Sequence, residues 1–145
     1  MQKQEPRSVE EIDIGDEIGP IVYVPTEEVV HRFATVVRMI DRRFIDPTVA
    51  QQKGFSSPIV PGPLSANRLT QMLIDYFPGW RLRTLSISFR SPVKHGEQLT
   101  CWGTVTEKDI TEGIPTVHCD VVAETAQGER AVVGTAILQR RMPRN

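Results

Sequence analysis

The residues of this 145-residue chain that are best suited to chemistry lie between Phe33 and Ser65. The first half of this stretch carries charged side chains around Phe44, namely Asp41, Arg42, Arg43 and Asp46. A carboxylate such as that of Asp41 can accept and release a proton during a reaction. The side chains of Met39 and Phe44, which lie close to Asp41 in the same stretch, cannot do this. The alternative is that Asp41 and the arginines are exposed loop charges and that Asp46 caps a short helix.

The second half of the stretch contains the turn Pro61-Gly62-Pro63, which we expect to open a helix. Proline lacks an N–H and fits the first helical turn, so the free backbone N–H groups there are those of Gly62, Leu64 and Ser65. Together with the helix dipole they would stabilise negative charge on a carbonyl oxygen. The alternative is a tight turn that simply starts a helix well.

Asn67 lies one turn into the same expected helix. Its amide can hydrogen-bond to a water or a carbonyl group, but it cannot act as a general base. Asn67 is therefore a candidate for positioning a ligand, or else a polar residue on an exposed helix face. Further along, basic residues gather around the first long predicted strand and its turn: Arg81, Arg83, Arg90 and Lys94. Arg90 and Lys94 are candidates for phosphate contacts, or they simply face solvent.

The composition excludes several classes of function. The formal net charge is −1, which gives no bulk attraction to nucleic acid or to an anionic membrane. The polar N-terminal sequence lacks the apolar region of a signal peptide, and no apolar run is long enough to span a bilayer. Two cysteines are too few for a disulfide framework, and no Cys/His spacing indicates a metal site. We expect one cytoplasmic domain over residues 1–145.

Hydrophobic periodicity predicts an α+β domain. Thr26 caps an expected helix whose apolar stripe runs to Val37, a short helix starts at Asp46-Pro47, and residues 61–77 form a largely buried helix. A short strand is expected at 18–25, and four later runs have the period of β-strands: 82–92, 97–108, 115–125 and 130–141. We expect these four runs to form an antiparallel meander that packs on the buried helix.

The loop after the first helix resembles the MaoC-like hydratase/dehydratase family of the hotdog fold. The family pattern F-A-x-x-x-G-D-x-N-P-x-H-x-D-x-x-x-A is matched here, without a gap, by Phe33, Ala34, Asp46 and Ala50. A second family signature, F-x-x-P-V-x-x-G-D/E-x-L, is matched by Phe89, Pro92, Val93, Gly96, Glu97 and Leu99. The catalytic Asp of the family falls on Met39, its catalytic His on Phe44 and its Asn on Asp41.

The resemblance implies a sheet wrapped around a central helix. It also implies an acyl thioester of coenzyme A or of a carrier protein as substrate or ligand, with no other cofactor. Since a single such sheet leaves an unpaired edge, we expect at least a homodimer. The run from Pro58 is also similar to the β-hydroxyacyl-carrier-protein dehydratases, through Pro58, Pro61, Gly62, Leu64 and Gln71. The catalytic His and Glu of those enzymes fall on Lys53 and Asn67, so this pair is missing as well.

Three functions remain open from the sequence. The first is a diverged enoyl-thioester hydratase or 3-hydroxyacyl dehydratase, in which Asp41, Asn67 or one of the histidines would replace the lost pair. The second is a non-catalytic subunit that assembles with an active homologue. The third is an acyl-thioester binder or a thioesterase, although the central helix carries only one carboxylate, Asp75, near its far end.

Overall fold

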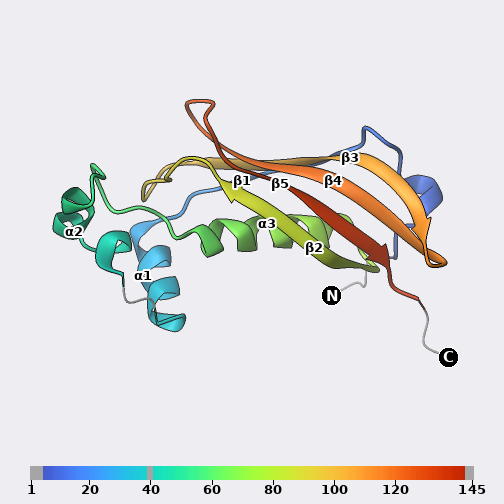
Figure 1. Cartoon of the computed structure of the whole chain (residues 1–145), viewed down its shortest axis with the longest axis horizontal. Coiled ribbons are helices and arrows are strands. Elements are labelled where there is room, and N and C mark those ends of the chain that lie inside the picture. The colour runs from blue at the N-terminus through green and yellow to red at the C-terminus, as the bar shows by residue number, and fades with distance from the viewer. Residues whose placement is uncertain (1–4, 39–40, 143–145) are drawn as a thin grey trace.

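The computed structural model describes residues 5–38 and 41–142. One curved antiparallel sheet carries a long helix, α3, across its concave face, and three short helical segments gather at one end of the sheet (Figure 1). The elements, in chain order, are η1 Val9–Glu11, β1 Glu17–Tyr23, α1 Glu27–Val36, η2 Arg42–Phe44, α2 Pro47–Gln52, α3 Gly62–Tyr76, β2 Trp80–Phe89, β3 Leu99–Thr111, β4 Ile114–Thr125 and β5 Arg130–Arg140.

The strand order is β1-β3-β4-β5-β2, so the predicted four-stranded meander is wrong for its first strand. Strands β3, β4 and β5 do form a meander, but β2 pairs with β5, with Phe89 opposite Val132. The segment 90–98 crosses the end of the sheet instead of turning back as a hairpin. Nine residues reach about 30 Å when extended, which is ample for the three strand spacings between β2 and β3.

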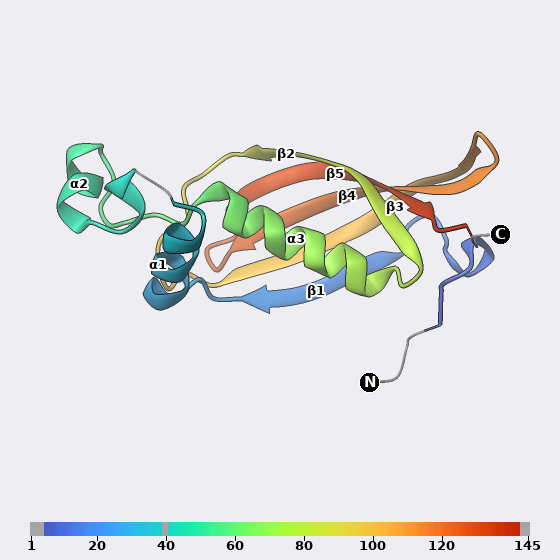
Figure 2. The same ribbon diagram turned by 90° about the horizontal axis from the view of Figure 1, so that it is seen from below.

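Helix α3 begins and ends where the sequence predicts. Pro61 precedes its first residue, Gly62, and Gly79 terminates the region with a left-handed φ of +84°. Its buried face rests against the middle of the sheet (Figure 2). Leu69, Leu73 and Phe77 are fully buried and form the centre of the core. The predicted α+β class is therefore confirmed: one buried helix packs on an antiparallel sheet.

The short helices at the end of the sheet are held by side-chain caps. The Thr26 hydroxyl accepts the Val29 N–H at 3.3 Å and starts α1. The Asp46 carboxylate accepts the N–H of Thr48 at 2.9 Å, and Pro47 occupies the first position of α2. The interpretation of Asp46 as a helix cap is confirmed. The helices that these caps start lie at the end of the sheet where the loop 41–60 folds over the start of α3.

Two strands, β1 and β2, form the edges of the described sheet, and their outer sides have no strand partner within it. The outer side of β2 is ten residues long and largely exposed. An unpaired edge of this length is suited to pairing with another chain. In the described ranges, no helix has the length and apolar character needed to cross a membrane.

Candidate ligand-binding site

A pocket of about 360 Å³ lies at the N-terminal end of α3. It forms where the loop before α3 meets the chain that leaves β2, and β5 contributes one residue. The side chains around it are mostly apolar. They belong to Phe44, Phe55, Ile59, Val60, Gly62, Pro63, Ser65, Phe89, Arg90, Ser91, Pro92, Val93 and Val132.

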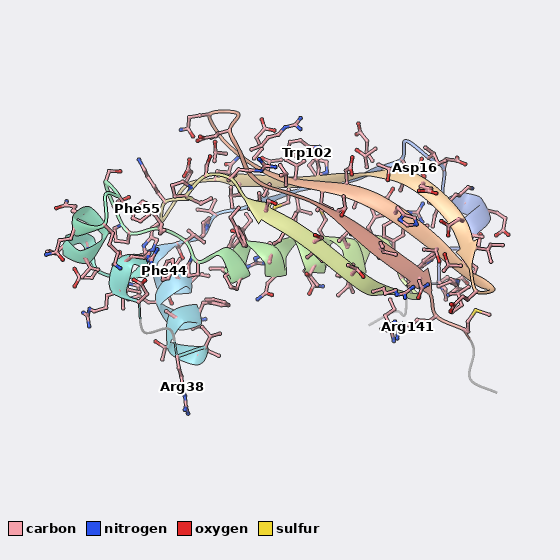
Figure 3. All side chains as sticks on the ribbon, in the orientation of Figure 1. Asp16, Arg38, Phe44, Phe55, Trp102 and Arg141 are labelled. Carbon is pink, nitrogen blue, oxygen red and sulfur yellow. The ribbon has the colours of Figure 1, made fainter. Side chains whose placement is uncertain are left out.

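Three phenyl rings shape this pocket. Phe44 and Phe55 come from the helical end of the molecule and lie near each other in Figure 3. Phe89, at the end of β2, lies over the first residue of α3: a Cβ placed on Gly62 would be only 2.6 Å from the Phe89 Cζ atom. The lack of a side chain at Gly62 therefore lets the Phe89 ring close over the helix start.

The backbone N–H groups at the start of α3 divide into two kinds. The Leu64 N–H already donates to the Pro61 carbonyl at 3.1 Å, and Leu64 does not line the pocket. Gly62 and Ser65 do line it, and among the described turn and cap hydrogen bonds neither of their N–H groups has a backbone acceptor. Two of the three predicted donors thus lie at the pocket with the positive end of the helix dipole behind them.

The pocket offers no group for proton transfer among its described lining residues. Arg90 is the only one with an ionisable side chain, and a guanidinium donates hydrogen bonds but has no atom that accepts one. Phe44, at the catalytic histidine position of the resembling family, lines the pocket with an apolar ring. Met39, at the position of the catalytic Asp, lies outside the described residues. The arrangement can hold an apolar group beside two N–H donors, but these side chains cannot move a proton.

The chain enters the loop before the pocket through an unusual backbone conformation. Arg38 has a left-handed φ of +55°, a conformation that side-chain-bearing residues rarely adopt. The family pattern has glycine at this position. Glycine adopts a left-handed φ without the steric cost that a side-chain-bearing residue such as Arg38 carries.

Asp41 is held by its own neighbours and does not line the pocket. Its carboxylate accepts the backbone N–H of Arg43 at 2.9 Å and the Arg43 Nε–H at 2.7 Å, and the Lys53 ammonium lies 3.8 Å away. The Arg43 hydrogen bonds lower the pKa of Asp41 to about 2. A carboxylate so stabilised in its charged form is a poor base, and these contacts are those of a loop clamp. The catalytic role of Asp41 stays a prediction without support from this geometry.

We expect Asp41→Asn to weaken the fold at neutral pH without changing any enoyl-thioester hydration. Since the folded pKa is lowered from 3.8 to about 2, the stabilisation is complete above pH 4 and disappears as the pH falls to about 2. Melting temperatures of both proteins between pH 6 and pH 2 should therefore converge at the acid end. Equal melting temperatures of the two proteins at pH 6 would contradict the stabilising role of the Asp41–Arg43 contacts. A loss of hydration activity in the variant would restore Asp41 as a catalytic group.

The other predicted site residues lie apart from the pocket. Asn67 is exposed on α3 and lines none of the described cavities. Lys94 is exposed, and its N–H donates to the Glu97 carboxylate at 3.0 Å. Arg90 does lie at the pocket. The expected basic cluster is divided in two, because Arg81 lies at the opposite end of β2 from Arg90.

The cysteines and the one candidate metal group are also remote from the pocket. Burial raises the pKa of the Cys101 thiol to about 11 and that of Cys119 to about 12, so both stay protonated and unreactive at neutral pH. Among the described residues, Glu107, Asp109 and His118 place their ligand atoms within 4.8 Å of one another. These three could hold a cation on the strands β3 and β4, but none of them contacts the pocket.

Sequence reasoning missed Phe55 and Phe89 as pocket residues. Phe89 begins the second family signature, which gave a signal for its position but not for its contact with Gly62. Phe55 follows the left-handed Gly54 in a loop, and no pattern in the sequence marks it as a pocket wall.

Comparisons with known proteins identify the family. The family model for the FAS1-like dehydratase domain region matches residues 12–133. The chain belongs to this family, and its fold is the hotdog fold of MaoC-like hydratases and dehydratases, as predicted. A comparison with curated protein sequences finds none that matches.

Solved structures of the same fold include an (R)-hydratase from A. caviae involved in PHA biosynthesis. It is 25% identical, with a TM-score of 0.81, over 92% of this chain and 98% of that one. A MaoC-like dehydratase from Rhodospirillum rubrum is 19% identical, with a TM-score of 0.78, over 93% and 97% of the two chains. A chain of the HadBC (3R-hydroxyacyl-ACP dehydratase) complex from Mycobacterium tuberculosis is 19% identical, with a TM-score of 0.77, over 89% and 98%.

Proposed function

We propose that this chain binds the acyl group of an acyl thioester in the pocket beside α3 and does not itself add or remove water. One observation carries the proposal: the pocket combines N–H donors at a helix start with apolar walls, and its described lining lacks both an acid and a base. The thioester oxygen would face Gly62 and Ser65. The acyl chain would lie against the rings of Phe44, Phe55 and Phe89.

The physical argument follows from what the reaction requires. Hydration of an enoyl thioester needs one group to activate water and one to protonate the carbon next to the carbonyl. Acid–base groups of this kind contribute a factor of about 10² to 10⁴ each to the rate. Binding needs neither of them, because burial of the acyl chain contributes about 0.8 kcal/mol per methylene group. The pocket retains what binding needs.

Two measurements on the purified protein test the proposal together. Isothermal titration with S-butyryl-pantetheine should give saturable binding that is tighter than that of pantetheine alone. Crotonyl-coenzyme A hydration, followed by loss of the enoyl absorbance beside a dehydratase of known activity, should stay at the background rate. Clear turnover would refute the non-catalytic part, and equal affinity for both pantetheine compounds would refute acyl binding.

Gly62→Ala should weaken S-butyryl-pantetheine binding by about tenfold while the fold persists. The backbone at Gly62 is not left-handed, so alanine is tolerated there, but its Cβ must displace the Phe89 ring that lies 2.6 Å away. A tenfold loss is about 1.4 kcal/mol, which is of the size expected for one pocket wall or one N–H contact.

The matched control for that change is Asn67→Ala on the same helix. Asn67 is exposed and lies outside the pocket, so its replacement should leave binding unchanged. A loss of binding in the Asn67 variant that equals the loss in the Gly62 variant would contradict the assigned site.

A second candidate function is that of a non-catalytic subunit in a hetero-oligomer. The observation that favours it is the exposed, unpaired edge of β2, which ends at the pocket residue Phe89. The similar HadBC structure is a complex of two different chains. A partner that carries the Asp/His pair would supply the chemistry that this pocket lacks.

Co-expression with such a homologue, followed by size-exclusion chromatography, tests the subunit function. A mixed oligomer whose turnover exceeds that of the homologue alone supports it. A stable homodimer that refuses the homologue counts against it. Homodimerisation by pairing of edges, and a cytoplasmic location, remain expectations.

A further inference from the structure

A second cavity, of about 430 Å³, lies at the other end of the sheet from the acyl pocket. It is bounded by the start of β2, the start of β4 and the end of β5. Figure 3 shows Arg141 at this end of the molecule, far from Phe44 and Phe55. The described residues around the cavity are Arg81, Ile114, Gln139, Arg140, Arg141 and Met142.

The cavity concentrates positive charge that the described structure does not neutralise. Three guanidinium groups line it, and no carboxylate is among its described lining residues. None of the ion pairs found within residues 5–38 and 41–142 involves Arg81, Arg140 or Arg141. A chain with a net charge of −1 thus has a local charge of +3 here, in a concave site where like charges repel unless an anion is bound.

The acidic group in the same row of paired strand residues as Arg81 already has partners of its own. The backbone register places Arg81 opposite Gln139, Gln139 opposite Thr116, and Thr116 opposite Asp109. Asp109 therefore lies three strands away from Arg81 in the same row. It contacts His118 at 3.2 Å and accepts the Thr111 hydroxyl at 2.8 Å.

Parts of the cavity are held in place by hydrogen bonds. The Arg140 guanidinium donates to the Gly79 carbonyl at 3.0 Å, and the Arg141 backbone N–H donates to the same oxygen at 2.9 Å. Gln139 is only 5% exposed, and its amide donates to the Thr116 hydroxyl at 3.4 Å. The floor of the cavity is thus formed by paired strands, and less side-chain entropy would be lost when a ligand binds.

We infer that this cavity binds a small phosphate-bearing ligand of the nucleotide class. Guanidinium groups match phosphate oxygens in two-point contacts, and their planes stack on aromatic rings. Ile114 and Met142 add an apolar wall that a bare phosphate would not use but a base would cover. The volume lies within the usual range for small-molecule sites.

This site is separate from the acyl pocket within one chain. Arg81 and Phe89 lie eight residues apart on β2, which is about 26 Å along an extended strand. The inference therefore does not depend on the proposed acyl binding. It is tested with ligands that have no acyl group.

The experiment is a titration of the whole protein with ADP, pyrophosphate and adenosine at low ionic strength. ADP should bind most tightly, and its affinity should fall as sodium chloride is added, because salt screens the guanidinium–phosphate attraction. The double variant R81Q/R141Q should bind ADP at least tenfold more weakly. Arg140 is left in place because its hydrogen bond to Gly79 contributes to the fold.

The control variant R32Q/R42Q also removes two positive charges, but from exposed ion pairs elsewhere on the molecule. It should therefore bind ADP as the original chain does. The R81Q/R141Q variant should also keep the circular dichroism spectrum and the melting temperature of the original chain, which shows that the loss is local. Absence of ADP binding, or an equal loss in the control, overturns the inference. Pyrophosphate that binds as tightly as ADP overturns the nucleotide class, and adenosine that does so overturns the phosphate contact.

Discussion

The double variant M39D/F44H should hydrate crotonyl-coenzyme A at least about a hundredfold faster than the original chain, whose rate should equal the background. The two changes restore, at positions 39 and 44, the residue types of the acid–base pair of the resembling family, and such groups contribute a factor of about 10² to 10⁴. Phe44 lines the pocket, so a histidine there would face the bound acyl group. The measurement is the loss of enoyl absorbance at saturating substrate.

The matched control for this gain of activity is M39D/F55H. Phe55 lines the same pocket from a different part of the loop, so this variant has the same two side chains in a different arrangement. It should stay at the background rate. Equal hydration rates for the two variants would mean that a histidine at either position suffices. If M39D/F44H binds S-butyryl-pantetheine but is inactive, the catalytic geometry of the family is lost at more than these two residues.

Phe77→Ala should destabilise the protein by about 3 to 5 kcal/mol, a large part of the 5 to 15 kcal/mol that a domain has. The Phe77 ring is fully buried between the end of α3 and the sheet, and it contacts Tyr76 and Trp80 with ring centroids 5.0 and 6.1 Å apart. Its removal leaves a cavity that paired strands cannot close. Urea unfolding followed by circular dichroism measures the loss, and the melting temperature should fall by about 10 to 15 °C.

Val36→Ala on α1 is the corresponding surface control. Val36 is 76% exposed at the end of α1, so its truncation should change the free energy of unfolding by no more than about 0.5 kcal/mol. A Phe77 variant as stable as the Val36 variant would contradict the placement of the core.

Local patterns predicted most of the secondary structure because helices and strands of this kind depend on near neighbours. Thr26 and Asp46 cap helices through groups two or three residues away, and the structure shows both contacts. The apolar spacing from Leu64 to Phe77 predicted the buried face of α3. The loop pattern between Phe33 and Ala50 predicted the family, which the match over residues 12–133 shows.

The order of the strands could not be predicted in this way. The alternating runs show that β2 and β3 are strands, but not which neighbours they pair with. Pairing between β2 and β5 joins residues about fifty positions apart, and it depends on how the segment 90–98 crosses the end of the sheet. The prediction of a four-stranded meander is wrong at this crossing, because strands joined by a hairpin and strands joined by a crossover show the same alternation of apolar and polar residues.

The sequence by itself determined the class of fold and the family, because these depend on residue types at fixed spacing. Only the tertiary structure decided which side chains surround each cavity. It brought Phe44, Gly62 and Phe89 together, placed Asp41 in a clamp with Arg43, and gathered Arg81 with Arg140 at the far end. Each of the two cavities is built from segments distant in the chain, and their meeting depends on sheet pairing and helix packing that no local spacing encodes.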